Sequence, residues 1–357
     1  MSTQRVEAEA PGTSAPRRRR GRTALVAVLV SLALLLGGVV AASIWLANDV
    51  ASSLQSIPDP FPAVRPSDPR PSADTGTTGD PVNILLLGSD SRSSSGDPGA
   101  WTYGGQRSDV IMLLHIPGDR QAAYVISIPR DSWVDIPGHG SAKINAAYSY
   151  GGMPLMIQTL ESRTGIRIDH VAIADFESFA DLTDALGGVQ ITIPQDTYAN
   201  GELTFRAGTQ TLSGEEALAY ARQRYGLPDG DFDRMRRQQN WIRAIAERAV
   251  DNEVLTSPRS LMRLVRTVSQ SVAVDPGFSL KEMASLGWSL RDVPPGNVTF
   301  LTLPTEGVGR SPDGKQSIVR LDNDAVDGLA RAIVDDDMAD FVAENADELS
   351  ILGQSVR

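Results

Sequence analysis

The sequence predicts a domain of the α/β class preceded by one transmembrane helix, and each part of that prediction rests on its own pattern. From Val82 onward, short apolar runs that suit buried strands alternate with longer runs of helical periodicity, as in folds that pack helices against a sheet. Before Val82, one long uncharged apolar run stands behind a group of arginines. The 357 residues leave enough chain after these N-terminal segments for one large α/β domain or two small ones.

The apolar run from Ala24 to Leu46 predicts one transmembrane helix. Its 23 residues exceed the roughly 20 that a helix, rising about 1.5 Å per residue, needs to cross a hydrocarbon core of about 30 Å. Five arginines precede the run, namely Arg17, Arg18, Arg19, Arg20 and Arg22. By the positive-inside rule, the tail 1–23 lies in the cytoplasm and the C-terminal bulk lies outside, which predicts a single-pass protein of the cell membrane.

A cleavable signal peptide is the alternative to a retained anchor. Such peptides have an apolar core of about 7–15 residues followed by a cleavage site of small residues. Val40-Ala41-Ala42 could serve as that site, but the apolar run is longer than a signal peptide needs. The sequence therefore favours a retained anchor.

Composition limits what the outer part can be. The chain has no cysteine, which excludes disulfides and thiolate metal sites. Six arginines of the tail outweigh Glu7 and Glu9 by four charges, so of the net charge of −11 the rest of the chain carries −15. An acidic exterior argues against nucleic acid as a partner, and an anionic substrate would need a local concentration of arginine.

Changes in composition divide the chain into segments. A segment rich in Pro, Ser, Asp and Gly follows the anchor and resembles an unfolded spacer, because it has little apolar surface to bury. The predicted organisation is a cytoplasmic basic tail (1–23), a transmembrane helix (24–46), an extracytoplasmic stalk (47–80), a folded domain (81–337) and a C-terminal tail (338–357).

Within the domain, periodicity and turn signals predict the individual elements. Strands are expected at residues 82–87, 110–116, 122–128, 168–174, 189–193 and 298–303. Helices are expected at residues 154–163, 176–186, 213–225, 233–250, 258–272, 279–290 and 324–335. Ser213 with Glu216 forms a predicted capping box at the start of one of these helices.

Charged side chains gather where the first strands end. If the turn at 117–120 joins the second and third strands as an antiparallel hairpin, and the first strand pairs antiparallel with one of them, one edge of the sheet holds several alternating acids and arginines. These residues are Asp90, Arg92, Arg107, Asp109, Arg130 and Asp131. Two carboxylates can bind Mg²⁺ together with substrate phosphates, and arginines bind phosphate oxygens. Solvated charge at strand ends is the alternative interpretation.

A second polar cluster contains Arg222, Arg224 and the helix that begins near Asp231. On that helix Gln238 and Gln239 flank the apolar stripe, and a buried amide without a partner costs about 1–3 kcal/mol. A functional role would supply partners, whereas a solvated basic face is the alternative. The three histidines, His115, His139 and His170, each stand alone, which indicates structural roles. The sequence contains no P-loop, dinucleotide fingerprint, GxSxG elbow or zinc signature.

Seven segments together closely resemble the LytR–CpsA–Psr family, over about residues 82–335 and in that family's order. They are NILLLGSDSR, RSDVIMLLHI, YVISIPRDSWVDIPG, KINAAY, IDHVAIADFESFADLTDALGGV, LSGEEALAYARQRY and DFDRMRRQQ. The resemblance implies a three-layer α-β-α sandwich with a mixed central sheet that encloses an apolar tunnel for a polyprenyl chain. Asp233 departs from the family pattern, because a glycine is frequent at that position.

The resemblance also implies roles for particular residues. Asp90 and Asp109 resemble the pair that coordinates Mg²⁺, with Mn²⁺ as a possible substitute. The residues implied to bind the diphosphate or to act in catalysis are Arg92, Arg107, Arg130, Arg222, Arg224, Arg234 and Gln238. Arg237 and Lys143 also lie in family motifs.

Members of this family move a glycopolymer, as a phosphosugar, from a polyprenyl diphosphate carrier onto the muramic acid C6 hydroxyl of peptidoglycan. The expected function is therefore a Mg²⁺-dependent phosphotransferase, with the lipid-linked glycopolymer, peptidoglycan and the membrane as partners. Two alternatives stay open. A polyprenyl diphosphate hydrolase would use the same residues, and a non-catalytic glycopolymer-binding or regulatory membrane protein would not need both aspartates.

Overall fold

The computed structural model describes residues 55–57, 60–61, 70–73, 79–89, 109–199, 201–223, 227, 229–249, 267, 272–353 and 356. No helix within these ranges is long and apolar enough to cross a bilayer. The predicted anchor at 24–46 and the tail before it lie outside the described residues, so the topology derived from them stays a prediction.

An eight-stranded mixed sheet forms the centre of the described chain, in the order β1-β12-β7-β2-β3-β4-β13-β16. The strands are β1 (Gln55–Ser56), β12 (Val272–Val274), β7 (His170–Asp175), β2 (Val82–Ser89), β3 (Val110–Ile116), β4 (Ala123–Ser127), β13 (Val298–Thr302) and β16 (Ser350–Ile351). β3 and β4 are antiparallel, as the predicted turn at 117–120 requires, and β2 and β3 are antiparallel, which was the second condition of the predicted meeting of strand ends. The strand pairs β2–β7 and β4–β13 are parallel.

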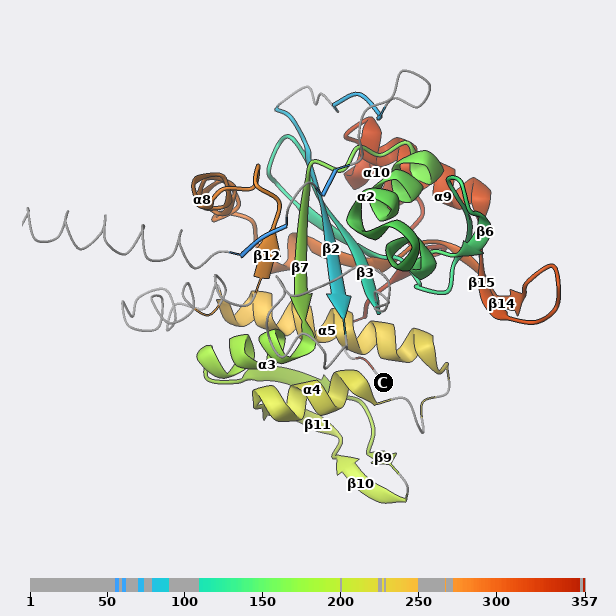
Figure 1. The fold of residues 1–357 in the computed structure, drawn as a ribbon. Helices are drawn as coiled ribbons and strands as arrows, with labels where there is room; N and C mark the ends of the chain where they lie inside the picture. Colours follow the sequence, from blue (N-terminus) through green and yellow to red (C-terminus); the bar gives the residue numbers. More distant parts are fainter. Residues whose placement is uncertain are drawn as a thin grey trace, which may run out of the picture. The chain divides into compact units, whose positions relative to one another are not determined.

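Helices cover both faces of this sheet (Figure 1). On one face lie α2 (Asn145–Thr164), α9 (Asn323–Val334) and α10 (Met338–Glu344). On the other lie α3 (Phe176–Ala185), α5 (Asp231–Ala249) and α8 (Leu280–Ser289). The predicted mixed sheet between helices is therefore confirmed.

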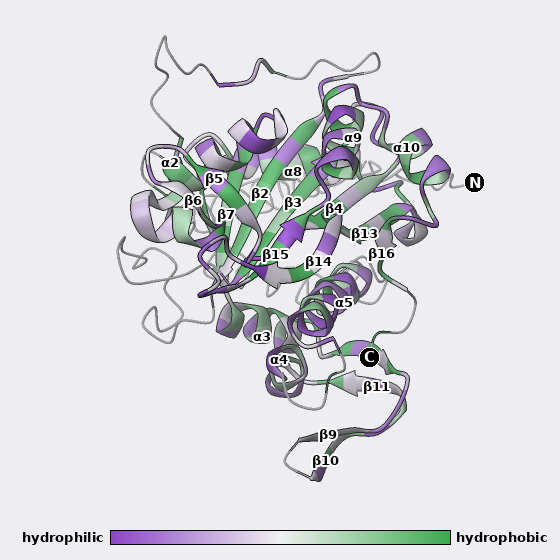
Figure 2. Ribbon diagram, turned by 90° about the vertical axis from the view of Figure 1, so that its right-hand side faces the viewer, coloured by the Kyte–Doolittle hydropathy of each residue, from purple (hydrophilic) through white to green (hydrophobic). Residues whose placement is uncertain are grey.

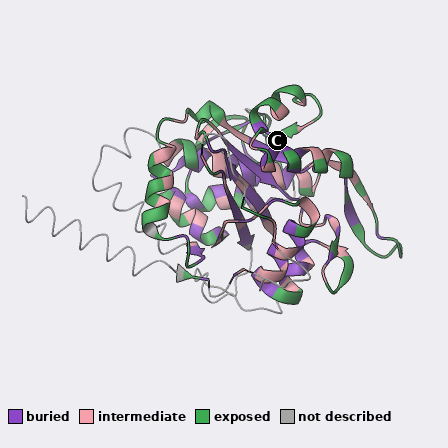
Figure 3. Cartoon of the chain, turned by 90° about the horizontal axis from the view of Figure 1, so that it is seen from above, coloured by how far each residue is buried: buried purple, intermediate pink, exposed green. Residues whose placement is uncertain are grey.

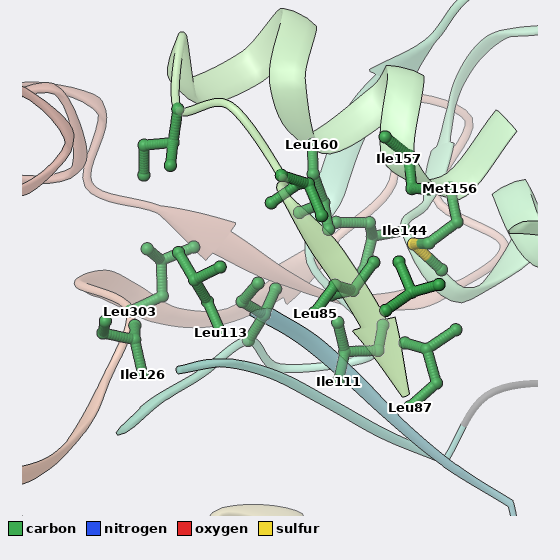
Figure 4. Packing of buried hydrophobic residues seen from close by; sticks show 14 of the residues in the cluster. Leu85, Leu87, Ile111, Leu113, Ile126, Ile144, Met156, Ile157, Leu160 and Leu303 are labelled. Carbon is green, nitrogen blue, oxygen red and sulfur yellow. The ribbon is translucent and has the colours of Figure 1, made fainter. Parts of the chain in front are cut away.

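Alternation along the strands divides the apolar side chains between two cores. On β2, Leu85 and Leu87 point to the face covered by α2 and α9, where they pack with Ile157 and Leu160 of α2 (Figure 4). Leu86 belongs to the opposite face, under α5 and α8. The central strands β2, β3, β4 and β7 are therefore largely buried (Figure 3) and rich in apolar residues (Figure 2), which explains the continuous apolar runs in the sequence.

A smaller layer lies beyond α3 and α5. It contains α4 (Gly214–Arg222) and the antiparallel pair of β8 (Val189–Ile193) and β11 (Gly208–Leu212), while β9 (Thr197–Ala199) and β10 (Glu202–Phe205) form a separate hairpin. The capping box at Ser213 and Glu216 is present. β8 was predicted as a strand, but it pairs with β11 and not with the main sheet.

Two further hairpins were not predicted from the sequence. They pair β5 (Trp133–Ile136) with β6 (Gly140–Lys143) and β14 (Thr305–Arg310) with β15 (Ser317–Leu321). Helix α2 is also longer than expected and contains a kink, where Gly152 adopts φ 64°. Side chains avoid that conformation, so the glycine lets the helix continue past the kink toward Pro154.

The predicted stalk is partly a component of the domain. β1 pairs in parallel with β12, Ile57 is buried, and its N–H donates to the carbonyl of Val274 at 2.8 Å. Arg70 forms an ion pair with the buried Glu161, with Nη2 and Oε1 2.5 Å apart. The assignment of 47–80 to a spacer is therefore wrong for these described residues, because a few apolar and charged side chains find partners that average composition does not reveal.

The predicted tail at 338–357 also belongs to the domain. It supplies α10 and β16, and β16 pairs antiparallel with β13 at the edge of the sheet. Leu352 and Val356 are buried against strand residues. Of the expected helix at 258–272, all but residues 267 and 272 lies outside the described residues, and Val272 begins strand β12.

Candidate functional site

The edge of the sheet where β3 begins and β4 ends carries the polar site. Asp109 immediately precedes β3, and its N–H donates to the carbonyl of Gly88 on β2 at 2.9 Å. On the other side, the N–H of Ile128, just after β4, donates to Ile111 at 2.8 Å. Arg130 consequently reaches Asp109, and the predicted meeting of strand ends is confirmed for these two residues.

Arg130 lies between two carboxylates. Its Nη1 donates to Asp109, and its Nη2 donates to Asp231 Oδ2 at 3.1 Å. Burial disfavours the charge of the guanidinium, but the carboxylates of Asp109, Asp231 and Asp131 outweigh burial and raise the pKa of Arg130 above its usual value. Arg130 therefore stays charged and is held in a fixed orientation.

Helix α5 completes the pocket from the other side. Asp231, its first residue, is 48% exposed and accepts from Arg130. It also pairs with Arg234 one turn further on, at 3.3 Å. Sequence reasoning did not include Asp231 among the site residues, although its place one turn before Arg234 on an expected helix was the available signal.

These side chains enclose a small polar pocket of about 50 Å³. Its lining consists of Asp109, Val110, Ile111, Met112, Ser127, Ile128, Pro129, Arg130, Asp131, Asp231, Phe232, Arg234, Met235, Gln238 and Val319. Two guanidinium groups, Arg130 and Arg234, therefore face one small space beside three carboxylates. Such a space suits an anionic ligand that brings its own counter-ions or replaces the carboxylates as the partner of the arginines.

A larger apolar cavity of about 190 Å³ lies beside the polar pocket, between the sheet and helices α3 and α5. It is lined by Leu86, Leu87, Gly88, Val110, Met112, Ala172, Ile173, Ala174, Phe176, Phe179, Gln238, Trp241, Ile242 and Val272. Val110, Met112 and Gln238 line both spaces, so the cavity and the pocket are neighbours with a shared wall.

Gln238 is the polar member of that shared wall. It is 5% exposed, and its side chain makes no hydrogen bond within the described part of the chain. The adjacent Gln239 is 1% exposed, yet its Nε2 donates to Ser127 Oγ at 2.7 Å and to the carbonyl of Leu301 at 3.0 Å. The amide atoms of Gln238 are not among the buried polar atoms that lack a partner in the described residues, so they are accessible from the two spaces that Gln238 lines, where a bound ligand could reach them.

Three further residues of the prediction lie within the described chain. Arg222 ends α4, and its guanidinium carbon lies 5.9 Å from the ring centroid of Phe176, a residue of the apolar cavity. Arg237 lines neither space. It is buried and donates to Gln223 Oε1 at 2.8 Å, and burial lowers the pKa of its guanidinium. Lys143 pairs with Asp131 at 3.1 Å on the rim of the polar pocket.

Asp90, Arg92, Arg107 and Arg224 lie outside the described residues, so their predicted roles stay predictions. Of the predicted metal pair, only Asp109 lies within the described residues. These residues contain no group of three or more His, Asp or Glu side chains that could hold a metal ion. The donor chemistry fits Mg²⁺, because this ion prefers oxygen ligands and uses one or two carboxylates together with substrate phosphates.

The histidines have structural surroundings. His115 is buried, its Nδ1 lies 2.8 Å from Asn83 Oδ1, and burial lowers its pKa to about 4. His170 lies 3.2 Å from Asp275, and His139 stacks on Tyr150. None of the three lines the polar pocket or the apolar cavity.

A pocket lined by two arginines and three aspartates shares a wall with an apolar cavity, and this combination suits an amphiphile with a charged head group. Comparison with known proteins identifies the family. The model of the LytR_cpsA_psr family matches residues 52–332, and the chain belongs to that family.

Relatives include the cell wall biosynthesis protein LcpA of Corynebacterium glutamicum, which is 32% identical over 75% of this chain and 60% of its own length. The polyisoprenyl-teichoic acid–peptidoglycan teichoic acid transferase TagT of Bacillus subtilis is 35% identical over 58% of this chain and 63% of its own. The chain therefore spans less than two thirds of these relatives.

Among solved structures, the LytR-Csp2A-Psr enzyme from Actinomyces oris aligns with a TM-score of 0.57 at 26% identity, over 76% of this chain and 95% of that one. TagT bound to LI-WTA aligns with a TM-score of 0.56 at 27% identity, over 79% of this chain and 98% of that one.

Proposed function

We propose that this protein is a membrane-anchored extracytoplasmic phosphotransferase. It moves a glycopolymer phosphosugar from a polyprenyl diphosphate carrier onto the muramic acid C6 hydroxyl of peptidoglycan. The observation that carries the proposal is the shared wall between the polar pocket and the apolar cavity, with the unpartnered amide of Gln238 in it. The printed names of the relatives, teichoic acid–peptidoglycan transferases among them, support the same substrate class.

The two neighbouring spaces match the two parts of the donor substrate. A diphosphate has the charge that Arg130 and Arg234 can bind, and the adjacent isoprene units suit a cavity lined by Phe176, Trp241 and Ile242. The cavity of about 190 Å³ is smaller than the 300–1,000 Å³ of typical ligand pockets. It therefore holds the first part of the lipid next to the head group, and the amide of Gln238 lies where the two parts join.

The reaction is a displacement at phosphorus. The acceptor oxygen forms a bond to the sugar-linked phosphorus, the bond from that phosphorus to polyprenyl phosphate breaks, and the hydroxyl proton passes to solvent or a nearby carboxylate. Phosphoryl transfer is accelerated mainly by positioning and by stabilising charge on the phosphate oxygens. Arg130 and Arg234 supply that charge, and Asp231 orients both guanidinium groups.

The proposed reaction includes a divalent cation at the diphosphate. Asp90 and Asp109 would hold Mg²⁺, or Mn²⁺ in its place, and the bound ion would add positive charge at the diphosphate. In the described chain Asp109 accepts from Arg130, so the arginine orients this carboxylate in the pocket.

The proposal is tested with the full-length protein in lipid nanodiscs. The assay supplies a polyprenyl diphosphate sugar, Mg²⁺ and peptidoglycan fragments, and measures both polyprenyl phosphate and sugar phosphate bound to muramic acid. We expect the two products in equal amounts. Release of polyprenyl phosphate without linkage to muramic acid would identify a hydrolase, and binding without either product would identify a tethering protein.

Arginine variants add a matched comparison. Arg130→Met removes a guanidinium from the pocket, whereas Arg163→Met removes one that pairs with Asp327 on the surface. We expect transfer to fall at least about 100-fold in the first variant, since a hydrogen bond to a charged group contributes about 1.5–3 kcal/mol and Arg130 also orders Asp109. Transfer should be unchanged in the second.

A further inference from the structure

The outer face of α8 has an aromatic side chain in solvent. None of the described α8 side chains is fully buried, and among them Met283 and Leu286 pack on the core. Trp288 near its end is 70% exposed, the highest value among the exposed large hydrophobic residues of the described chain. Arg291 lies over its ring at 4.6 Å, and its Nη1 donates to the carbonyl of Trp288.

Helix α8 stands beside the apolar cavity. The small core beneath it is built from Ile84, Val274 and Phe278, and Met283 and Leu286 of α8 pack on it. Three further members of that core, Leu86, Ala172 and Val272, also line the cavity. Strand residues thus connect the inner face of α8 directly to the cavity proposed to receive the lipid.

The same side of the domain receives the N-terminal tether. β1 pairs with β12, and only five residues separate the end of β12 at Val274 from the start of α8 at Leu280. The predicted transmembrane helix ends at Leu46, so residues 47–54 join it to β1. Eight residues span at most about 29 Å when fully extended, which limits how far β1 can lie from the bilayer.

We propose that α8 is a membrane-contact helix whose Trp288 lies in the headgroup region of the outer leaflet. The proposal rests on the membrane anchoring in the proposed function. A tryptophan that presents both apolar area and an N–H donor is the residue type enriched at membrane–water interfaces, and an adjacent Arg291 can extend its guanidinium toward phosphate groups.

Charge contributes little to this contact. Lys281 precedes Glu282, and Arg291 pairs with Asp292 at 2.9 Å, so the four charges of the surface cancel. The contact should therefore form on neutral lipids and withstand moderate salt, unlike a basic patch that needs anionic lipids. The arrangement places the cavity beside the leaflet from which an isoprenoid carrier would enter.

The absence of cysteine permits a direct test on the full-length protein. Trp288→Cys and Val308→Cys each introduce one thiol for a nitroxide spin label, and Val308 on β14 is a matched control because it is also apolar and 64% exposed. In phosphatidylcholine nanodiscs, the accessibility of each label to oxygen, which partitions into lipid, is compared with its accessibility to a water-soluble nickel complex.

We expect the oxygen-to-nickel ratio to be at least severalfold higher at position 288 than at position 308, with no change between 50 and 300 mM salt. Equal ratios would overturn the proposal. Dipolar broadening between two labels at position 288 would also overturn it, because a second copy of the chain would then cover α8. Failure of the protein to remain with the nanodiscs would also overturn the proposal, because the domain would then not be held at a membrane.

Activity gives a second readout. Trp288→Ser should raise KM severalfold for a long-chain carrier embedded in the nanodisc, with kcat unchanged, and should leave KM unchanged for a short, water-soluble carrier. An equal effect on both carriers would contradict a membrane role for Trp288. Failure of the proposed function is distinguishable, because unmodified protein would then transfer from neither carrier while the label result at position 288 could still be positive.

Discussion

Replacing each of two adjacent glutamines by methionine separates a structural amide from a ligand-binding one. Gln238 and Gln239 follow each other on α5, and both are at least 95% buried. Methionine has a similar length and volume but does not donate a hydrogen bond, so Gln238→Met and Gln239→Met remove the amides with little change in packing.

The expected stability changes follow from the partners. Gln239→Met loses two hydrogen bonds, to Ser127 and Leu301, at about 1 kcal/mol each, and leaving a buried carbonyl without this donor adds about 1 kcal/mol. Its unfolding free energy should therefore fall by about 3 kcal/mol. Gln238→Met loses no hydrogen bond within the described chain and places an apolar atom beside an apolar cavity, so the change should stay within about 1 kcal/mol.

Thermal unfolding of the full-length protein in detergent measures the difference. At about 2–4 °C per kcal/mol, Gln239→Met should lower Tm by about 6–12 °C, and Gln238→Met by less than about 4 °C. Transfer activity should show the opposite order. Loss of one hydrogen bond to a charged head group, worth about 1.5–3 kcal/mol, should reduce transfer by Gln238→Met roughly 10–100-fold.

Equal destabilisation by the two variants would refute this reasoning, because Gln238 would then have a partner within the protein. A normal rate of transfer by Gln238→Met would refute the assignment of its amide to the ligand. Gln239→Met assayed well below its own Tm is the matched control, and its transfer rate should remain close to that of the unmodified protein.

Three further predictions concern other charged groups. Asp231→Asn should reduce transfer about 10-fold or more without changing Tm, because Arg130 loses one of its two carboxylate partners at the half-exposed rim. Replacement of His115 by Gln should remove part of the acid sensitivity of the fold. The folded pKa of about 4 lies below the ordinary 6.5, so the folded state is fully stable above pH 6.5 and loses about 3 kcal/mol of unfolding free energy as the pH falls toward 4. Urea unfolding at pH 4 and pH 7 measures this loss in the unmodified protein and in the variant. Glu161→Gln should lower the unfolding free energy by about 2–4 kcal/mol, because it leaves the largely buried Arg70 without its counter-charge, and a loss below 1 kcal/mol would contradict that account.

The sequence was most informative where a pattern is periodic. The strands that became β2, β3, β4, β7 and β13 were each predicted to within two residues at either end, because both of their faces are buried and their apolar runs are continuous. The two-residue strands β1 and β16 were missed, since so short a strand has no periodicity and depends wholly on its partner.

The part of the candidate site that depends on strand topology could be predicted from the sequence. An antiparallel hairpin at 117–120 was enough to bring Asp109 and Arg130 to one edge. Asp231 was missed, because its contact with Arg130 joins residues about one hundred positions apart, and only the packing of α5 against the sheet creates it. The unpartnered state of Gln238 also needed the structure, because its helical position resembles that of the fully bonded Gln239.

The short parallel pairing of β1 with β12 also bears on how the protein would respond to force. A pull between membrane and wall would enter the domain at two paired residues and at the backbone hydrogen bond of Ile57, and then at the ion pair of Arg70. To free residues 55–80, the bond from Arg167 Nη1 to the carbonyl of Pro71 and the packing of Phe61 on the core would also have to break. The freed segment spans about 90 Å when extended, while the central strands keep their partners. The N-terminal segment would thus act as a reserve of chain length, letting a loaded domain move away from the bilayer and rejoin it when the load falls.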